Sequence, residues 1–482
     1  MALRELVAAE YASLQLFAPT WFYMLSTAAV TQNTVNYFAS LMGSDTWVAQ
    51  DTYLAGIGLG SILHSCSIMG FMLGYSTVFD VYGPQLCGRA QRARLGTLLV
   101  KCLLQGALLY LLALGPYYGL MCLVDMVPSV ECSAEARDVT NRYMSLMSGT
   151  VFLEFAVDLL FKFFTNHNYM TVVYVMAVAQ SVSFVAFCYL LVIGVGMKTE
   201  GLVVALVCSR ILTLLGSVVV MVSRATDLGL RRRILSSVWE NWGAMLRIGL
   251  ACGANFVLLE IGYVVAICLT QLGGAVNVAA LAILLRVEAI SLSSSVALAY
   301  TTAIQVGNAL GQGDEIKMRY FIKLGFFNTL IERLLFVSLF LTFRLDYIAI
   351  FSTDPVVLAV GADASYYLAA ILVLQNLQQF VCRGVLLALG RARFVSLLSM
   401  FAVVVCGTPI MFLLAWFTDL HVRGLLLGVL LERGIVVCGA AVRSAMLRFS
   451  EEVARCDARL AAGFRKLEGE AVPLVQGEEL TL

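Results

Sequence analysis

Twelve long apolar stretches run through this chain of 482 residues. A helix needs about 20 apolar residues to cross the hydrocarbon core of a bilayer, and each stretch reaches that length. Because lipid offers the backbone no hydrogen-bond partner, such stretches are stable there as helices. Charged residues make up only 13% of the chain, against about 25% in a soluble domain. We therefore predict an all-α membrane protein with twelve transmembrane helices, at residues 16–41, 53–79, 98–124, 143–164, 170–195, 202–222, 245–269, 278–300, 321–343, 366–389, 394–417 and 425–447.

The charged residues between these stretches indicate how the chain is oriented. Basic residues such as Arg92 and residues 231–233 follow even-numbered stretches, whereas acidic residues such as Asp125 and Asp346 follow odd-numbered ones. Basic loops stay on the cytoplasmic side of a membrane. We therefore expect both termini in the cytoplasm, with the protein in a plasma or vacuolar-type membrane.

An internal repeat divides the chain, since two segments have nearly the same sequence at equivalent places in its halves. Tyr75-Ser-Thr-Val-Phe-Asp-Val-Tyr-Gly-Pro-Gln-Leu-Cys-Gly corresponds to Tyr300-Thr-Thr-Ala-Ile-Gln-Val-Gly-Asn-Ala-Leu-Gly-Gln-Gly, and residues 201–210 correspond to 424–433. Many transporters consist of such repeats and bind substrate between them. We predict an N-lobe with helices 1–6 (1–222), a cytoplasmic amphipathic linker (223–243), a C-lobe with helices 7–12 (244–449) and a cytoplasmic tail (450–482).

The second copy of the repeat resembles a signature of the multidrug and toxic compound extrusion (MATE) family. In that family a sequence of the type Arg-Val-Gly-Asn-x-Leu-Gly-Ala-Gly closes the eighth helix. The matching residues here are Gly307, Asn308 and Gly311, whereas Gln305 stands where the family usually has the arginine. The three matches favour assignment to the MATE family, and Gln305 is one departure from the family sequence.

Two further segments carry the same resemblance. Residues 79–88, with Asp80 and Gly83, are similar to the second-helix sequence of the family, and residues 383–393, with Gly384, resemble its tenth-helix element. The matches extend from the second stretch to the eleventh. The chain is thus identified as a member of the MATE family, in the multidrug/oligosaccharidyl-lipid/polysaccharide flippase superfamily.

The resemblance implies both an architecture and an activity. Two six-helix lobes surround a central cleft, which opens alternately to either side and exports organic cations, or other bulky xenobiotics and metabolites, in exchange for protons. We expect a small-molecule substrate, the lipid bilayer as surroundings, a monomer, no nucleic acid and no cofactor besides the coupling ion, H+ or alternatively Na+. The sequence contains no nucleophile elbow, phosphate-binding loop or metal cluster, which argues against an enzyme.

Other functions stay open at this point. The chain lacks family acids in its first, seventh and tenth helices, so a sodium-coupled exporter, a dedicated exporter of a metabolite or lipid precursor, or a non-transporting membrane scaffold are alternatives. The loop at 83–94 also resembles the basic loop motif of major-facilitator transporters, but it lacks the acidic-basic pair that this motif requires.

Charges inside a membrane span are costly and are therefore candidates for function. Glu260 lies in the middle of the seventh stretch, where the resemblance places a family glutamate, and we predict that it exchanges a proton for the substrate. Arg286, Glu288 and Glu154 are further candidates for proton coupling or cation binding. For Glu260 the structural alternative is an ion pair with Arg286.

Several other charges have simpler expected roles. Asp158 and Lys162 are four residues apart, so we expect a structural ion pair on one helix face. Asp80 ends the second stretch, where we expect it to cap the helix or to pair with Arg92 or Arg94. We expect solvated or paired side chains near helix ends for Glu332, Arg333, Arg210 and Arg433.

Amides and aromatic rings are expected to form the cleft walls, because they offer hydrogen bonds and cation-attracting faces to a bulky ligand. The candidates are Gln32, Asn33, Asn36, Tyr37, Asn255, Tyr263, Tyr300, Gln375 and Asn376.

Overall fold

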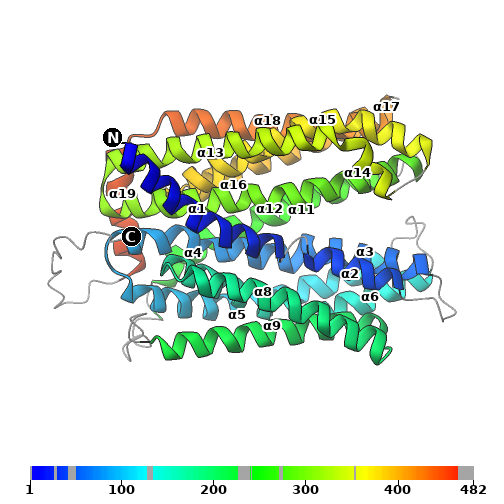
Figure 1. Cartoon of the computed structure of the whole chain (residues 1–482), viewed down its shortest axis with the longest axis horizontal. Helices are drawn as coiled ribbons and strands as arrows, with labels where there is room; N and C mark the ends of the chain where they lie inside the picture. Colours follow the sequence, from blue (N-terminus) through cyan, green and yellow to red (C-terminus); the bar gives the residue numbers. More distant parts are fainter. Residues whose placement is uncertain are drawn as a thin grey trace.

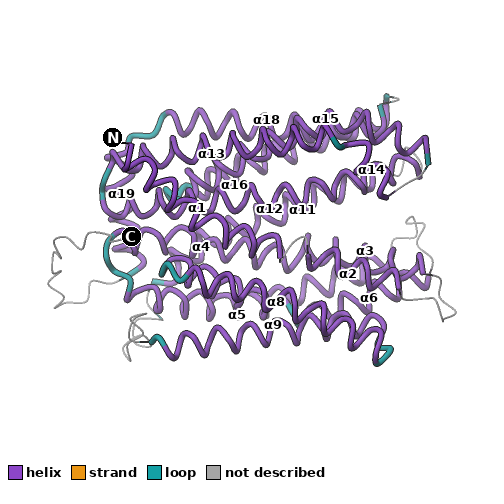
Figure 2. Tube along the Cα trace, viewed as in Figure 1, coloured by secondary structure: helices purple, strands orange, loops and turns teal. Residues whose placement is uncertain are grey.

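The computed structural model describes residues 3–26, 30–41, 50–126, 134–225, 239, 241–270, 275–351, 354–418 and 420–464. Within these ranges the regular structure is helical throughout, with short turns between the helices (Figure 2). Nine helical segments among the described residues are long and apolar enough to cross a membrane, and a bent pair of helices forms a tenth if it is one span. The two remaining predicted stretches, 16–41 and 245–269, fall on α1 with α2 and on α11.

The described residues of the first half form nine helices in sequence order. A π-helical segment, Ser65–Met69, joins α3 to α4, and another, Tyr189–Gly194, extends α8. The helices are α1 (Leu3–Leu25), α2 (Thr31–Leu41), α3 (Gln50–His64), α4 (Gly70–Gly88), α5 (Ala93–Met126), α6 (Ala134–Ser148), α7 (Val151–Asn166), α8 (Met170–Cys188) and α9 (Lys198–Ser223).

The described residues of the second half also form nine helices. The π-helical segments Phe380–Leu387 and Phe401–Gly407 continue α15 and α16. The helices are α11 (Trp242–Thr270), α12 (Ala275–Gln312), α13 (Glu315–Thr342), α14 (Arg344–Phe351), α15 (Pro355–Gln379), α16 (Ala392–Met400), α17 (Thr408–Phe417), α18 (His421–Ala445) and α19 (Phe449–Gly463).

Capping residues in the sequence explain where α13 and α15 begin. The Asp314 carboxylate accepts a hydrogen bond of 2.9 Å from the Lys317 N–H and caps α13, and this bond lowers the pKa of the Asp314 carboxyl. Asp354 caps α15 in the same way, with Pro355 as the first residue of the helix.

The predicted span 143–164 was wrong in one respect, because it is interrupted. α6 ends at Ser148 and α7 begins at Val151, with a bend of 49° between them. Gly149 has low helix propensity, and the Thr150 hydroxyl donates a 2.8 Å hydrogen bond to the Met147 carbonyl. A glycine flanked by hydroxyl residues of this kind is a recognised cause of helix kinks.

The helices lie in two layers (Figure 1). Helices α2 to α9 form one layer and α11 to α18 the other, while α1 crosses between them and packs on both α8 and α12. The closest association of the layers is that of α4 with α11 and α12. The lobe boundaries at 222 and 244 stay a prediction, since residues 226–238 lie outside the described ranges.

The two copies of the repeat meet face to face where α4 and α12 end. A Cβ atom added to Gly88 would lie 2.1 Å from the Asn308 carbonyl oxygen, and one added to Gly311 would lie 2.4 Å from the Gln85 carbonyl oxygen. Gly307 is similarly close to Pro84. Only glycine permits this backbone approach.

Two other glycines of the family motifs pack inside their own halves. A Cβ added to Gly83 would lie 3.1 Å from the Asn166 side chain, and one added to Gly384 would lie 3.3 Å from the Ala299 carbonyl oxygen. The motif glycines therefore serve helix packing both within and between the halves.

The predicted tail begins as the helix α19, which lies across the end of the bundle near the chain termini (Figure 1). Lys101 of the first half donates a 3.2 Å hydrogen bond to the Gly463 carbonyl, and Asp457 pairs with Arg89. Arg391 of the second half pairs with Glu452, which is 1% exposed. α19 is thus bound to both halves.

Replacing Gly311 with alanine should destabilise the contact between the halves by about 1–3 kcal/mol, the usual cost of overpacking. We expect a lower Tm for the purified variant. Gly216→Ala is the matched control, because no atom lies within 4 Å of a Cβ added there. Equal Tm values for the two variants would contradict the close approach.

Replacing Glu452 with alanine should cost about 1.5–3 kcal/mol, since it removes charge-assisted hydrogen bonds to Arg391 and Arg455. Its neighbour Glu451 pairs only at the surface, so Glu451→Ala should change stability by at most about 0.5 kcal/mol. Thermal unfolding of both variants checks this, and an unaltered Tm for Glu452→Ala would disprove the docking of α19.

Candidate functional site

A cavity of about 390 Å³ lies between the two halves. Helices α1, α4 and α7 supply its first-half wall, whereas α11, α12, α15, the segment Phe380–Leu387, α16 and α18 supply the second-half wall. Apolar side chains such as Leu73, Phe256 and Val296 line much of it. The cavity therefore has the size and lining of a site for a small organic molecule.

Three charged side chains form a cluster on the first-half wall. Lys162 Nζ lies 3.1 Å from Asp80 Oδ1 and 3.4 Å from Asp158 Oδ2. Ser76 completes the cluster, because its hydroxyl donates to Asp158 at 2.6 Å and accepts from Lys162 at 2.8 Å. All three charges are buried. α7 places Asp158 and Lys162 one turn apart, and α4 brings Asp80 against them.

The predicted role of Asp80 was therefore wrong. Asp80 binds Lys162 of α7 and neither of the arginines after α4. It lies eight residues before Gly88, which is about 12 Å along a helix, so it is inside the bundle and not at its end. Arg94 instead lies 5.9 Å from the ring centre of Phe464.

The cluster has an excess of negative charge. Two carboxylates share the one ammonium of Lys162, in a buried place where unpaired charge is costly. Such a site favours the uptake of one further positive charge. A proton or a cationic group of a ligand can supply it, and the binding of one excludes the other.

The repeated arginines Arg210 and Arg433 each bind a glutamate within their own half. Arg210 lies 3.3 Å from Glu154. Arg433 lies 3.9 Å from Glu288, which also accepts a 2.9 Å hydrogen bond from Gln375. The expected pairing is confirmed, but the expected place near helix ends was wrong, because both arginines are buried in the middle of α9 and α18. The roles of Glu154 and Glu288 in proton coupling stay predictions.

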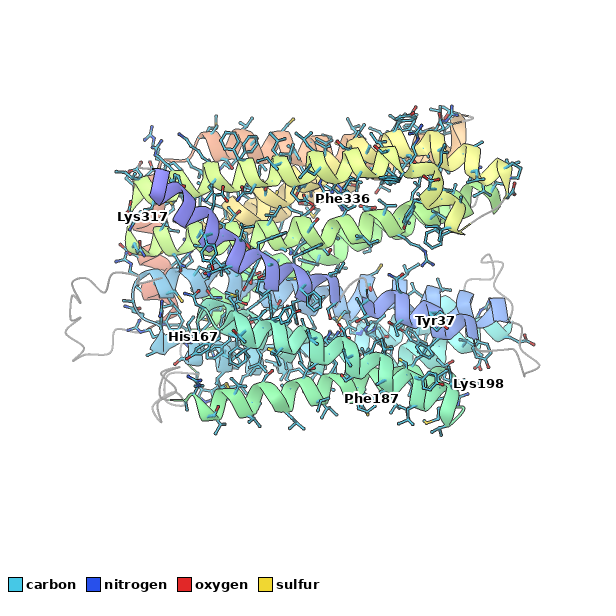
Figure 3. All side chains as sticks on the ribbon, in the orientation of Figure 1. Tyr37, His167, Phe187, Lys198, Lys317 and Phe336 are labelled. Atoms are coloured by element: carbon cyan, nitrogen blue, oxygen red, sulfur yellow. The ribbon has the colours of Figure 1, made fainter. Side chains whose placement is uncertain are left out.

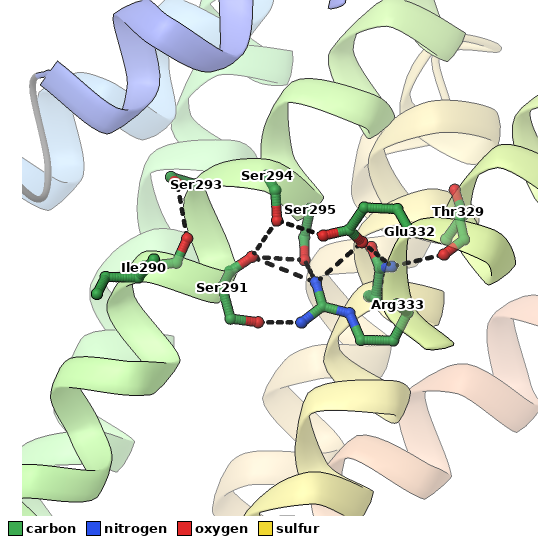
Figure 4. A network of polar contacts seen from close by, with 9 residues as sticks. Ile290, Ser291, Ser293, Ser294, Ser295, Thr329, Glu332 and Arg333 are labelled. Atoms are coloured by element: carbon green, nitrogen blue, oxygen red, sulfur yellow. Dashed lines mark hydrogen bonds and ion pairs between the residues drawn. The ribbon is translucent and has the colours of Figure 1, made fainter. Parts of the chain in front are cut away.

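A second polar network lies within α12, α13 and α15 (Figure 4). Arg333 is 2% exposed and hydrogen-bonds the serines of α12, and Glu332 accepts from Ser294 at 2.6 Å and from Asn376 at 2.9 Å. The expected place near a helix end was wrong, because both charges lie inside α13. Asn376 belongs to this network and does not line the cavity that we describe.

The other predicted cleft residues divide into three groups. Asn255, Tyr300 and Gln375 line the cavity. Asn33 accepts a 3.5 Å hydrogen bond from Arg286, and Tyr37 is 61% exposed on α2, away from the cavity (Figure 3). For the remaining predictions the structure describes the backbone helices but not the side chains: Gln32, Asn36, Glu260 and Tyr263.

Sequence reasoning missed part of the cavity wall. The ion pair of Asp158 with Lys162 was predicted and is confirmed, but its place at a cavity was not. Two charges in one apolar span were a signal for it, because each is costly in lipid. Arg383 also lines the cavity, and the sequence showed it only as the start of a motif.

Comparisons with known proteins agree with one another. The family model MatE matches residues 251–413. From Arabidopsis thaliana, Protein DETOXIFICATION 20 is 28% identical over 214 residues, 43% of each chain, and Protein DETOXIFICATION 35 is 23% identical over 459 residues, 92% of this chain and 87% of its own. The chain spans less than half the length of the first relatives that it matches.

Solved structures with the same fold include a eukaryotic MATE transporter, AtDTX14. It superimposes with a TM-score of 0.85 at 16% identity, over 94% of this chain and 99% of its own. An outward-facing multidrug resistance MATE family transporter of the MOP superfamily gives a TM-score of 0.74 at 16% identity, over 93% and 96%. The likeness confirms the predicted fold of twelve transmembrane helices in two lobes.

Replacing Lys162 with methionine should destabilise the protein by about 3–5 kcal/mol, because it leaves two buried carboxylates without their shared cation. Arg142 is the control, since its pair with Glu200 is exposed and Arg142→Met should cost at most about 1 kcal/mol. Thermal unfolding at neutral pH measures both. If Lys162→Met unfolds no earlier than Arg142→Met, the cluster is not held by Lys162.

Proposed function

Since the chain belongs to the multidrug and toxic compound extrusion (MATE) family, whose members are transporters and not enzymes, we propose that it exports organic compounds across a membrane in exchange for protons. The observation that carries the proposal is the negative cluster of Asp80, Asp158 and Lys162 on the wall of a cavity between two repeats. Relatives named for detoxification support an exported compound that is foreign or toxic.

The contact between the repeats supports alternating access. Gly88 and Gly311 hold the halves together at the end where the termini lie, as alternating access requires of its closed side. With both termini in the cytoplasm, as the loop charges predict, this conformation faces outward. Parting the α4–α12 contact would open the cavity to the cytoplasm.

The cluster provides the exchange step. In the outward-facing state a proton binds the excess carboxylate and displaces the cationic group of the substrate. After the halves move, the proton leaves to the cytoplasm and a new substrate takes its place. Because one carboxylate cannot hold both, proton entry and substrate exit are coupled without any covalent step.

We propose two places for the coupling. The geometry supports Asp80 with Asp158 in the first half, and the family resemblance adds Glu260 in the second half. Carboxylate oxygens also bind Na+, so sodium coupling is the alternative that the experiment must separate.

The test is efflux of a fluorescent organic cation from reconstituted vesicles under an imposed proton gradient. Asp158→Asn and Asp80→Asn should each reduce efflux at least about tenfold, because an amide cannot bind the proton. Glu315→Gln is the matched control at an exposed carboxylate and should behave as wild type. Glu260→Gln, in the same assay, decides whether the second half contributes.

Two results would contradict the proposal. Undiminished proton-driven efflux by both aspartate variants would exclude the cluster as the exchange site. Efflux that depends on a sodium gradient and not on the proton gradient would show that the coupling ion is Na+ and not H+.

A further inference from the structure

Arg383 is a cavity-lining cation that forms no ion pair with a carboxylate within the described part of the chain. It lies in the π-helical segment Phe380–Leu387 on the second-half wall. Its guanidinium carbon is 4.6 Å from the ring centre of Phe256, and no described carboxylate oxygen lies within 4 Å of its nitrogens. By contrast, the buried arginines Arg210 and Arg333 each bind a glutamate.

The guanidinium is also without a hydrogen-bond acceptor among the described residues. Arginine carries five N–H donors and remains charged at any physiological pH. The Phe256 ring contacts one face of the group but accepts none of these donors in a strong hydrogen bond. Donors that face a cavity unpaired are free to bind an anionic group of a ligand, and a carboxylate fits their fork-like arrangement.

A second donor in the same cavity has no hydrogen-bond partner in the described part of the protein. The Tyr300 hydroxyl is buried, in a side chain that is 5% exposed, and it makes no hydrogen bond to any described group. A buried hydroxyl is costly unless a ligand or water completes its bonding. Arg383 and Tyr300 together therefore offer a positive charge and an added donor.

The charges of the cavity limit the net charge of its ligand. Among the described residues that line the cavity, Arg383 carries one positive charge and the Asp80, Asp158 and Lys162 cluster carries one excess negative charge, and the two form no direct ion pair. Arg433 is balanced by Glu288. A simple organic cation would bind the cluster and leave Arg383 without an anionic partner, and a simple anion would bind Arg383 and leave the excess carboxylate without a cation.

We propose that the substrate is amphoteric, with an apolar body, a basic group that binds at the Asp80–Asp158 cluster and a carboxylate or similar anionic group that binds Arg383 and Tyr300. This inference rests on the proposed export function and specifies its substrate class. Only the basic group competes with the proton, so exchange proceeds as described above, while Arg383 selects for the second group.

Three probes with one indole body and different charges test this inference: tryptophan, tryptamine and indole-3-propionate. Each is radiolabelled and its transport is measured in reconstituted vesicles under the same proton gradient. Wild type should transport tryptophan at least about tenfold faster than tryptamine or indole-3-propionate. Preference for tryptamine, or equal rates for tryptophan and tryptamine, would overturn the inference.

Variants of Arg383 and Tyr300 test whether these residues cause the preference for tryptophan. Arg383→Gln should reduce tryptophan transport about tenfold and leave tryptamine transport at or above its wild-type rate, and Arg383→Lys should restore part of the preference. Tyr300→Phe should weaken tryptophan transport about threefold. Arg443→Gln is the matched control, because that guanidinium also lies over a phenylalanine ring, 5.8 Å from the centre of Phe394, but does not line the cavity.

The outcomes separate this inference from the proposed function. Proton-driven transport of tryptamine without any preference for tryptophan would retain the exporter and overturn the amphoteric substrate. An equal loss for all probes in Arg383→Gln would also overturn it, because that pattern indicates a structural role. If no probe moved under any gradient, both proposals would fail.

Discussion

The contact of bare backbone between α4 and α12 is the constraint on which the arrangement of this protein depends. Gly88 lies against Asn308 and Gly311 lies against Gln85, at separations that exclude any side chain. Lipid provides no hydrophobic drive to bring helices together, so close packing over small residues has to hold them. Because the two copies of the repeat supply the two surfaces, the duplication in the sequence becomes a pseudo-symmetric closure in space.

Charges inside the bundle follow a simple arrangement. Glu154 with Arg210 is a closed pair that joins α7 to α9, and Glu332 with Arg333 is a closed pair on α13 that is hydrogen-bonded to α12 and α15. The charges that face the cavity are not paired one to one. Two carboxylates bind the single ammonium of Lys162, and the guanidinium of Arg383 lies over the ring of Phe256. The uneven charges are those that a ligand can reach, which is the distribution expected of a binding site.

Much of the fold could be predicted from the sequence, because spans of about 20 apolar residues and basic loops are strong signals. The ion pair of Asp158 with Lys162 was predictable from its spacing. The partner of Asp80 was not, since sequence spacing does not show which faces of α4 and α7 meet. The bend at Gly149 and the place of Asn376 likewise depend on tertiary packing.

The docking of α19 makes the ends of the chain part of the conformational balance. Any conformation that separates the halves on this side must release α19 from Arg391 or from Lys101 and Arg89. The contacts that are lost then count in the free-energy difference between the two conformations. The helix α19 therefore affects the balance between the two conformations without lining the cavity.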